Sequence, residues 1–291
     1  MSPFVALLLI CIVVGFGAFL AGLAPLSFTL SPERIRFVSA FGTGVLVGTS
    51  LIVIIPEGVE TLNSVEAESI RQTMGLSLVC GFVLMYIIEK VPDYISQRRG
   101  QGFLPISIDL GALRPREVPS GDENMDQSPE NGQKSTAMST SVGLVIHSIA
   151  DGIALGASIS SQNVALELLV FLAIMIHKAP AAFGFSTVLL REDLSMAMIK
   201  RHLAAFAAAA PLGALITFAI IEIFGSSGDD SIMWWTGVLL IFSGGTFLFV
   251  AVHALQRGDD TKDLPGNDGP LFLLTVAGML FPLVTLAVPD I

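Results

Sequence analysis

Three ionisable residues stand inside long apolar stretches of the sequence. His147 and Asp151 are four positions apart, and on a helix this spacing places both side chains on one face, about 6 Å apart along the axis. His177 lies in the next apolar stretch, and Pro180 after it is expected to kink a helix and free a backbone carbonyl. Because ionisable groups are costly in hydrocarbon, each of these residues is a functional hypothesis by default.

Two imidazoles and a carboxylate form a ligand set of nitrogen and oxygen atoms. Such a set suits Zn²⁺, Mn²⁺ or Fe²⁺, whereas Cu⁺ would favour thiolates or thioethers. A structural hydrogen bond is the alternative for the pair of His147 and Asp151, but a third group at the same depth favours a metal. The sequence therefore predicts a metal site formed by His147, Asp151 and His177.

The elements that must position these residues are membrane spans. Of the 291 residues, 53% are hydrophobic and 14% are charged, which excludes a water-soluble fold. A helix that crosses about 30 Å of hydrocarbon needs roughly 20 mostly apolar residues. Eight segments meet this requirement, at about 4–24, 36–56, 73–91, 140–160, 164–190, 202–224, 232–255 and 270–289. We expect an all-α fold, a polytopic membrane helical bundle of eight transmembrane helices, with the three ligands near mid-membrane.

The basic residues are distributed unevenly among the connecting segments. Arg71 lies on one side of the predicted membrane and Lys178 lies inside the fifth span. The other thirteen of the fifteen basic residues fall on the opposite side, at Arg34, Arg36, Lys90, Arg98, Arg99, Arg114, Arg116, Lys134, Arg191, Lys200, Arg201, Arg257 and Lys262. Because cytosolic loops are enriched in Lys and Arg, that side is predicted to be cytosolic and both termini are predicted to be non-cytosolic.

The spans divide into two groups. Residues 1–91 hold transmembrane helices 1–3, and residues 140–291 hold transmembrane helices 4–8. Residues 92–139 are predicted to form a disordered cytosolic loop, because they lack apolar periodicity. The motifs Gly44-x-x-x-Gly48 and Gly152-x-x-x-Gly156 are predicted to let helices pack closely.

The candidate ligands lie in two motifs, HSIADGIALGAS at 147–158 and HKAPAAFG at 177–184. These motifs resemble the paired signatures of the ZIP (Zrt/Irt-like) metal transporters. The resemblance extends over essentially the whole chain, since that family also has eight spans, termini outside and a variable cytosolic loop between spans three and four. It implies that His147, Asp151 and His177 bind one metal ion. In most ZIP proteins the same two spans hold two adjacent ions.

The chain departs from the family pattern at three positions. Ser148 stands where Asn is usual, Lys178 where Glu is usual, and Ala181 where a His or Glu that helps join the two sites is usual. The resemblance therefore implies that the second metal site has lost its carboxylates. The Lys178 ammonium could occupy that position, and a structural ion pair with Asp151 is the alternative. The HKAPA variant also resembles the branch of the family associated with the Golgi.

The charged residues outside the predicted metal site indicate which ligands the chain can bind. The formal net charge of -10 argues against nucleic acid, because phosphate binding needs a clustered basic surface. Acidic residues gather on the non-cytosolic face and would attract divalent cations there. Among them Glu57, at the end of the second span, is the candidate for first contact with incoming ions. Glu89, His202 and His253 near the cytosolic ends of spans are either exit ligands or ordinary interfacial residues.

We therefore expect a transporter that moves a divalent metal ion, zinc before manganese, from the lumen or exterior into the cytosol by alternating access. A manganese homeostasis carrier of the same fold is one alternative. An intramembrane zinc-dependent lipid hydrolase is the alternative from another class, although the one carboxylate at that depth would already bind the metal. The chain is predicted not to be an enzyme and to need no resident cofactor, with Zn²⁺ or Mn²⁺ as the transported substrate.

The expected surroundings follow from the same reasoning. The predicted partners are a divalent metal ion and the lipid bilayer, with no nucleic acid. The oligomeric state is left open, with a homodimer as one candidate. As a multi-pass integral membrane protein, the chain is expected in the Golgi or another endomembrane, with the plasma membrane as the alternative.

Overall fold

The structure is a computed structural model that describes residues 2–27, 31–63, 70–100, 129–161, 164–192, 194–224, 229–259 and 268–287. Within these ranges every regular element is helical. The α-helices are α1 (Pro3–Leu23), α2 (Pro32–Thr49), α3 (Ile55–Asn63), α4 (Ile70–Gly100), α5 (Pro129–Ser160), α6 (Val164–Arg191), α7 (Met196–Phe224), α8 (Asp229–Asp259) and α9 (Asp268–Leu280). A π-helical turn at Ser50–Ile54 joins α2 to α3, and 3-10 helices lie at Ala24–Ser27 and Phe281–Ala287.

Seven helical stretches among the described residues are long and apolar enough to cross a membrane. They are Pro3–Ser27, Glu33–Asn63, Ile70–Val91, Thr140–Ser160, Leu166–Arg191, Met196–Ile223 and Ser231–Gln256. These stretches confirm the polytopic helical membrane bundle and coincide with the first seven predicted spans.

The eighth predicted span holds a shorter apolar stretch, Gly269–Val284. Here α9 continues directly into the 3-10 helix Phe281–Ala287, which contains Pro282. Proline has no backbone N–H and removes an α-helical hydrogen bond, and a 3-10 helix rises about 2 Å per residue. Measured along the chain, the two segments amount to roughly 33 Å, whereas the α-helix alone measures about 20 Å.

Apolar side chains on the outer helices face away from the bundle. Ile12 and Phe16 on α1 are 63% and 64% exposed, and Leu76 on α4 is 66% exposed. In water such a surface would favour association. In a bilayer it is the expected contact with lipid tails, because hydrocarbon is as apolar as these side chains.

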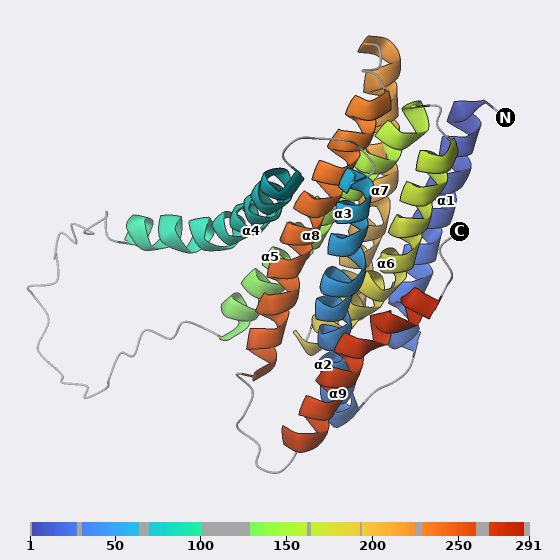
Figure 1. The fold of residues 1–291 in the computed structure, drawn as a ribbon. Coiled ribbons are helices and arrows are strands. Elements are labelled where there is room, and N and C mark those ends of the chain that lie inside the picture. Colours follow the sequence, from blue (N-terminus) through green and yellow to red (C-terminus); the bar gives the residue numbers. More distant parts are fainter. Residues whose placement is uncertain are drawn as a thin grey trace, which may run out of the picture.

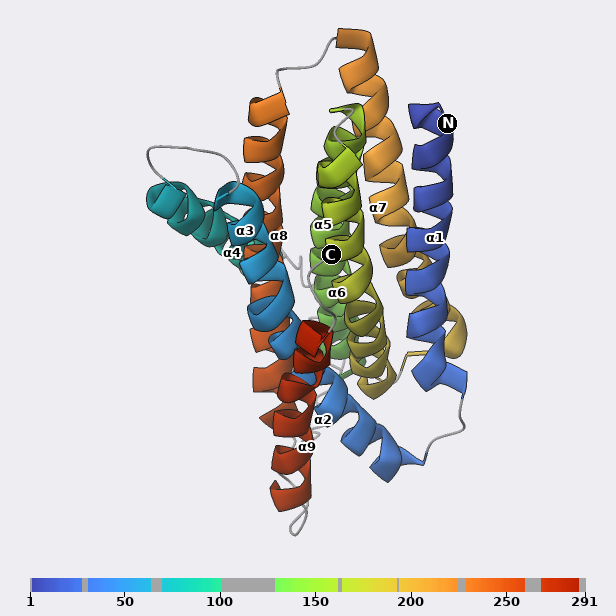
Figure 2. The same ribbon diagram turned by 45° about the vertical axis from the view of Figure 1, so that its right-hand side comes forward.

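Helix α5 lies at the centre of the arrangement. It packs against α6, α7 and α8, whereas α2 packs against α6, α8 and α9. Figure 2 shows α1 and α7 on one side of α5, with α8, α3 and α4 on the other. In Figure 1, α1, α6 and α8 end at the lower end of the molecule, where α2, α7 and α9 begin. The consecutive pairs α1 and α2, α6 and α7, and α8 and α9 therefore run in opposite directions, as the predicted topology requires.

Both glycine motifs lie where helix backbones approach each other closely. A Cβ added at Gly152 or Gly156 would collide with the backbone of α7, and one added at Gly44 or Gly48 would collide with the backbone of α9. Close approach of this kind is how small residues stabilise helix pairs in lipid. The packing role predicted for the two motifs is confirmed.

The helices beside the long predicted loop extend further than expected. α4 runs to Gly100 and α5 begins at Pro129, so helix occupies both ends of the segment 92–139. The apolar pattern marks where a helix leaves the hydrocarbon, but the helix can continue into water beyond that point. The rest of the predicted loop, residues 101–128, lies outside the described residues.

Candidate metal centre

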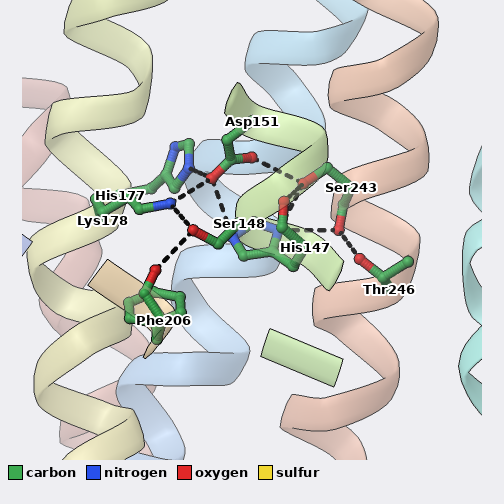
Figure 3. A network of polar contacts seen from close by, with 8 residues as sticks. All are labelled: His147, Ser148, Asp151, His177, Lys178, Phe206, Ser243 and Thr246. Carbon is green, nitrogen blue, oxygen red and sulfur yellow. Dashed lines mark hydrogen bonds and ion pairs between the residues drawn. The ribbon is translucent and has the colours of Figure 1, made fainter. Parts of the chain in front are cut away.

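Polar side chains from three helices meet inside the bundle (Figure 3). α5 supplies His147 and Asp151, α6 supplies His177 and Lys178, and α8 supplies Ser243. All five residues are at most 1% exposed. The spacing of four along α5 turns His147 and Asp151 to one face, as predicted. The structure therefore brings the three predicted ligands together in the interior of the bundle.

One oxygen of Asp151 is the centre of the group. Asp151 Oδ2 lies 3.4 Å from His147 Nε2 and 3.3 Å from His177 Nε2. Ligand atoms of the three residues all lie within 4.8 Å of one another. In Figure 3 the Asp151 carboxylate lies between the side chains from α6 and the serine on α8.

These separations are close to those of a metal coordination sphere. Zinc binds His nitrogen and carboxylate oxygen at about 2.0–2.2 Å, and tetrahedral angles then separate neighbouring ligand atoms by about 3.4 Å. The two distances from Asp151 Oδ2 to the imidazoles, 3.3 and 3.4 Å, already match this value. A small approach of the two imidazoles would complete a three-ligand site with one position left for water or a further ligand.

The side chain of Lys178 points into the same group. Its Nζ donates hydrogen bonds to Ser148 Oγ at 2.7 Å and to Asp151 Oδ2 at 3.1 Å. Ser148 Oγ in turn donates to the Phe206 carbonyl of α7 at 2.9 Å, and Nζ lies 5.0 Å from the centroid of the Phe206 ring. The ion pair between Lys178 and Asp151, one of the two readings from sequence, is present in the structure. Lys178 therefore lies directly beside the carboxylate of a predicted metal ligand.

Two residues singled out from the sequence lie outside the polar group around Asp151. Ala181 is fully buried within the hydrophobic core, where its methyl group offers no ligand. Glu57 lies in the first turn of α3 and is half-buried, and it takes no part in the network drawn in Figure 3. Its role in first contact with ions stays a prediction. Pro180 lies within α6, where its missing N–H leaves the carbonyl one turn earlier without its usual donor.

Sequence reasoning missed the contribution of α8. Ser243 Oγ lies 2.5 Å from His147 Nδ1 and donates to Asp151 Oδ1 at 2.8 Å. Thr246 Oγ1 donates to the Ser243 carbonyl at 2.7 Å. The available signal was the polar run Ser243–Thr246 inside an otherwise apolar span, but serine and threonine in membrane helices often bond their own backbone and carry no ligand signal.

A second ionisable pair connects α4 with α8. His253 Nδ1 lies 3.4 Å from Glu89 Oε1, and Lys90 Nζ lies 3.6 Å from the same oxygen. His202, the third residue considered for an exit path, lies on α7 instead. The structure thus brings together two of the three residues, and their exit role stays a prediction.

The fold and the buried group define a class of protein. Membrane-length helices enclose a carboxylate and two imidazoles, and ionisable groups in such a position mark ion pathways in membrane proteins. The ZIP Zinc transporter family model matches residues 3–136 and 111–281 of the chain.

Relatives of similar length also belong to the zinc transporters by name. The chain is 34% identical over 309 residues to "Zinc transporter ZIP9" of Micropogonias undulatus, with 98% of each chain covered. It is 34% identical over 308 residues to "Zinc transporter ZIP9-B" of Xenopus laevis, again with 98% of each covered. "Zinc transporter 3" of Arabidopsis thaliana is 22% identical over 257 residues, which cover 87% of this chain and 73% of the relative. The chain belongs to the ZIP family of metal transporters. It is therefore a transporter rather than an enzyme, and the lipid hydrolase alternative is set aside.

Proposed function

We propose that the protein carries zinc from the lumen or exterior into the cytosol, and that His147, Asp151 and His177 bind the ion in transit. The observation that carries this proposal is the convergence of three ligand atoms within 4.8 Å at a fully buried point. Relatives named zinc transporters over the full length support zinc as the substrate.

The burial of the ligands bears on the mechanism. His147 and Asp151 are 0% exposed and His177 is 1% exposed, so an ion cannot exchange with either side in this conformation. Transport then requires helices to move and open the site to each side in turn, which is alternating access. Helix α5 carries two of the ligands and α6 the third, so these two helices must move together to keep the site intact.

The proposed orientation in the membrane follows from the distribution of basic residues. Arg34 and Arg36 on α2, Arg191 at the end of α6, and Lys200 and Arg201 on α7 all belong to helix ends at the lower end of Figure 1. The enrichment of Lys and Arg on cytosolic faces supports that end as cytosolic and both termini as non-cytosolic. Glu57 on the opposite side is then the residue proposed for first contact with incoming ions.

Lys178 is proposed to replace the second metal ion of typical family members. Its ammonium lies where it neutralises Asp151, and Ser148 and Ala181 offer no carboxylate for a second ion. The protein would then bind one ion at a time, beside the Lys178 ammonium. The structure contains the ion pair, with the ammonium 3.1 Å from the ligand oxygen, and the proposal adds that the ammonium there takes the place of a second ion.

Three finer points belong to the same proposal. The ligand set accepts manganese as well as zinc, so manganese is the alternative substrate. The HKAPA motif supports a Golgi or other endomembrane location, with the plasma membrane as the alternative. A homodimer is the proposed assembly to be tested beside the monomer.

The test is metal flux into vesicles that contain the purified full-length protein and a zinc-sensitive dye. We expect His147→Ala, Asp151→Ala and His177→Ala each to abolish zinc uptake, because loss of one ligand leaves a two-ligand site. The matched control is Ser158→Ala, since the Ser158 hydroxyl is buried in α5 and, among the contacts described, donates only to the Leu155 carbonyl of its own helix. Wild-type uptake rates in all three ligand variants would show the site assignment to be wrong. Parallel runs with manganese decide between the two substrates.

A further inference from the structure

The hydroxyl of Ser243 joins two of the proposed ligands across a helix boundary. Ser243 lies on α8, whereas His147 and Asp151 both lie on α5. We infer that Ser243 is a positioning residue for metal binding: it fixes which nitrogen of His147 faces the ion and which oxygen of Asp151 is left to bind it. This inference rests on the proposed function and adds a residue from a third helix to the site.

The positions of the protons support the inference. Asp151, paired with the Lys178 ammonium, has no proton to donate, so the contact of 2.8 Å between Ser243 Oγ and Asp151 Oδ1 must use the serine hydroxyl hydrogen. The serine oxygen then has only lone pairs to offer His147 Nδ1, 2.5 Å away, and the Ser243 carbonyl lies 3.3 Å from the same nitrogen. The Nδ1 atom must therefore carry the imidazole proton.

This arrangement directs the other nitrogen of His147 toward Asp151 Oδ2, the oxygen that accepts a hydrogen bond from Lys178 Nζ. A neutral imidazole with its proton on Nδ1 has a lone pair on Nε2, and His147 Nε2 is buried without a hydrogen-bond partner. It lies 3.4 Å from Asp151 Oδ2, the oxygen that Ser243 does not bond. One hydroxyl thus turns an imidazole lone pair and a carboxylate oxygen toward the same point.

The backbone of α8 is held firmly at this position. Thr246 Oγ1 donates to the Ser243 carbonyl at 2.7 Å, and Ser50 Oγ of the π-helical turn donates to the Gly244 carbonyl at 3.4 Å. Gly245 lies so close to α4 that an added Cβ would collide with the Leu78 carbonyl. Contacts with the π-helical turn and with α4 therefore fix where α8 presents its hydroxyl, which a positioning role requires.

The experiment compares two variants of the same shape. Ser243→Thr keeps the hydroxyl, whereas Ser243→Val replaces it by a methyl group of similar volume. Each full-length protein is purified, and its affinity for Zn²⁺ is measured by calorimetry. Because loss of a hydrogen bond that orients a metal ligand typically lowers metal affinity 10- to 100-fold, we expect a loss of about that size in Ser243→Val and recovery of most of it in Ser243→Thr.

A spectroscopic readout separates positioning from general stability. Bound Co²⁺ has an absorption spectrum that reports the geometry of its ligands, and we expect this spectrum to change in Ser243→Val but not in Ser243→Thr. Ser158→Ala, a buried serine on α5 away from the network, is the control and should leave affinity and spectrum unchanged. Equal affinity and equal spectra in the Val and Thr variants would overturn the inference, whether or not both variants lose thermal stability.

The result also separates this inference from the proposed function. Loss of zinc binding in His147→Ala with normal binding in Ser243→Val would reject the role of Ser243 and leave the metal site in place. Absence of zinc binding by the wild-type protein would reject both.

Discussion

Replacement of Lys178 by methionine would test the proposed role of the buried ammonium. Methionine is one atom shorter and keeps an unbranched apolar side chain, but it removes the charge and the hydrogen bonds to Asp151 and Ser148. We expect the metal-free protein to become less stable and its affinity for zinc to rise. The maximal transport rate should fall, because an ion that is held more tightly leaves more slowly.

The contacts of Lys178 give the size of the effect. Its Nζ lies 3.1 Å from Asp151 Oδ2 and both side chains are buried, and removal of one partner of such a pair costs about 3–5 kcal/mol. A divalent ion about 2 Å from Oδ2 would lie roughly 4 Å from the ammonium, where repulsion at an effective dielectric of about 20 amounts to about 8 kcal/mol before desolvation. Movement of the lysine and of the surrounding dipoles absorbs much of this. We therefore expect an increase in zinc affinity of at least about tenfold, or about 1.4 kcal/mol.

The assay combines calorimetric zinc titration with thermal unfolding of the purified protein, with and without zinc. Lys178→Met should melt below the wild type without zinc and regain stability with zinc, because the ion replaces the missing positive charge. Lys178→Glu adds a ligand in the same place and should also bind a second, weaker ion, since Ala181 offers no ligand to it. Lys90→Met is the control, because the Lys90 side chain is 54% exposed. Unchanged affinity in Lys178→Met, or two tight ions in the wild type, would refute the reasoning.

Two further predictions concern topology and packing. An epitope inserted at residue 125 should be accessible from the cytosol, and a C-terminal epitope only from the lumen or exterior. Antibody labelling after selective permeabilisation measures both. A cytosolic C-terminus would reverse the proposed direction of transport. Gly156→Leu should lower the yield of folded protein and the melting temperature, because its side chain would collide with the backbone of α7. Gly75→Leu is the matched control, since an added Cβ at Gly75 on α4 meets nothing within 4 Å, and equal losses in both variants would reject the packing argument.

The sequence predicts the parts of the site that depend on local periodicity. The spacing of four between His147 and Asp151 fixes their common helix face, and the lengths of two antiparallel spans place His177 at a similar depth. The all-helical bundle follows from apolar segment lengths in the same way. Each of these inferences needs only the rise and the repeat of an α-helix, and the structure brings the three residues together as expected.

The parts that escaped prediction depend on contacts between distant segments. Ser243 lies 96 residues beyond His147 in the chain, and no periodic pattern marks a serine that turns toward another helix. The π-helical turn between α2 and α3 and the 3-10 end of α9 also arise from local departures from the α-helical repeat. The sequence left two readings of Lys178 open, because whether its ammonium reaches Asp151 depends on how α5 and α6 pack.

The charges at the centre of the bundle bear on how such a carrier completes its cycle. With both imidazoles neutral, as metal ligands must be, the negative charge of Asp151 and the positive charge of Lys178 cancel without any bound ion. An unpaired carboxylate at this depth would be costly in free energy. A carrier with such a carboxylate would meet this cost each time its empty site reorients. The proposed role of Lys178 is therefore to let the empty site reorient. Tighter binding slows zinc release in both modes, but exchange of zinc across the membrane never requires an empty return. Exchange should therefore slow less than net uptake in Lys178→Met, and equal slowing of both processes would contradict this role.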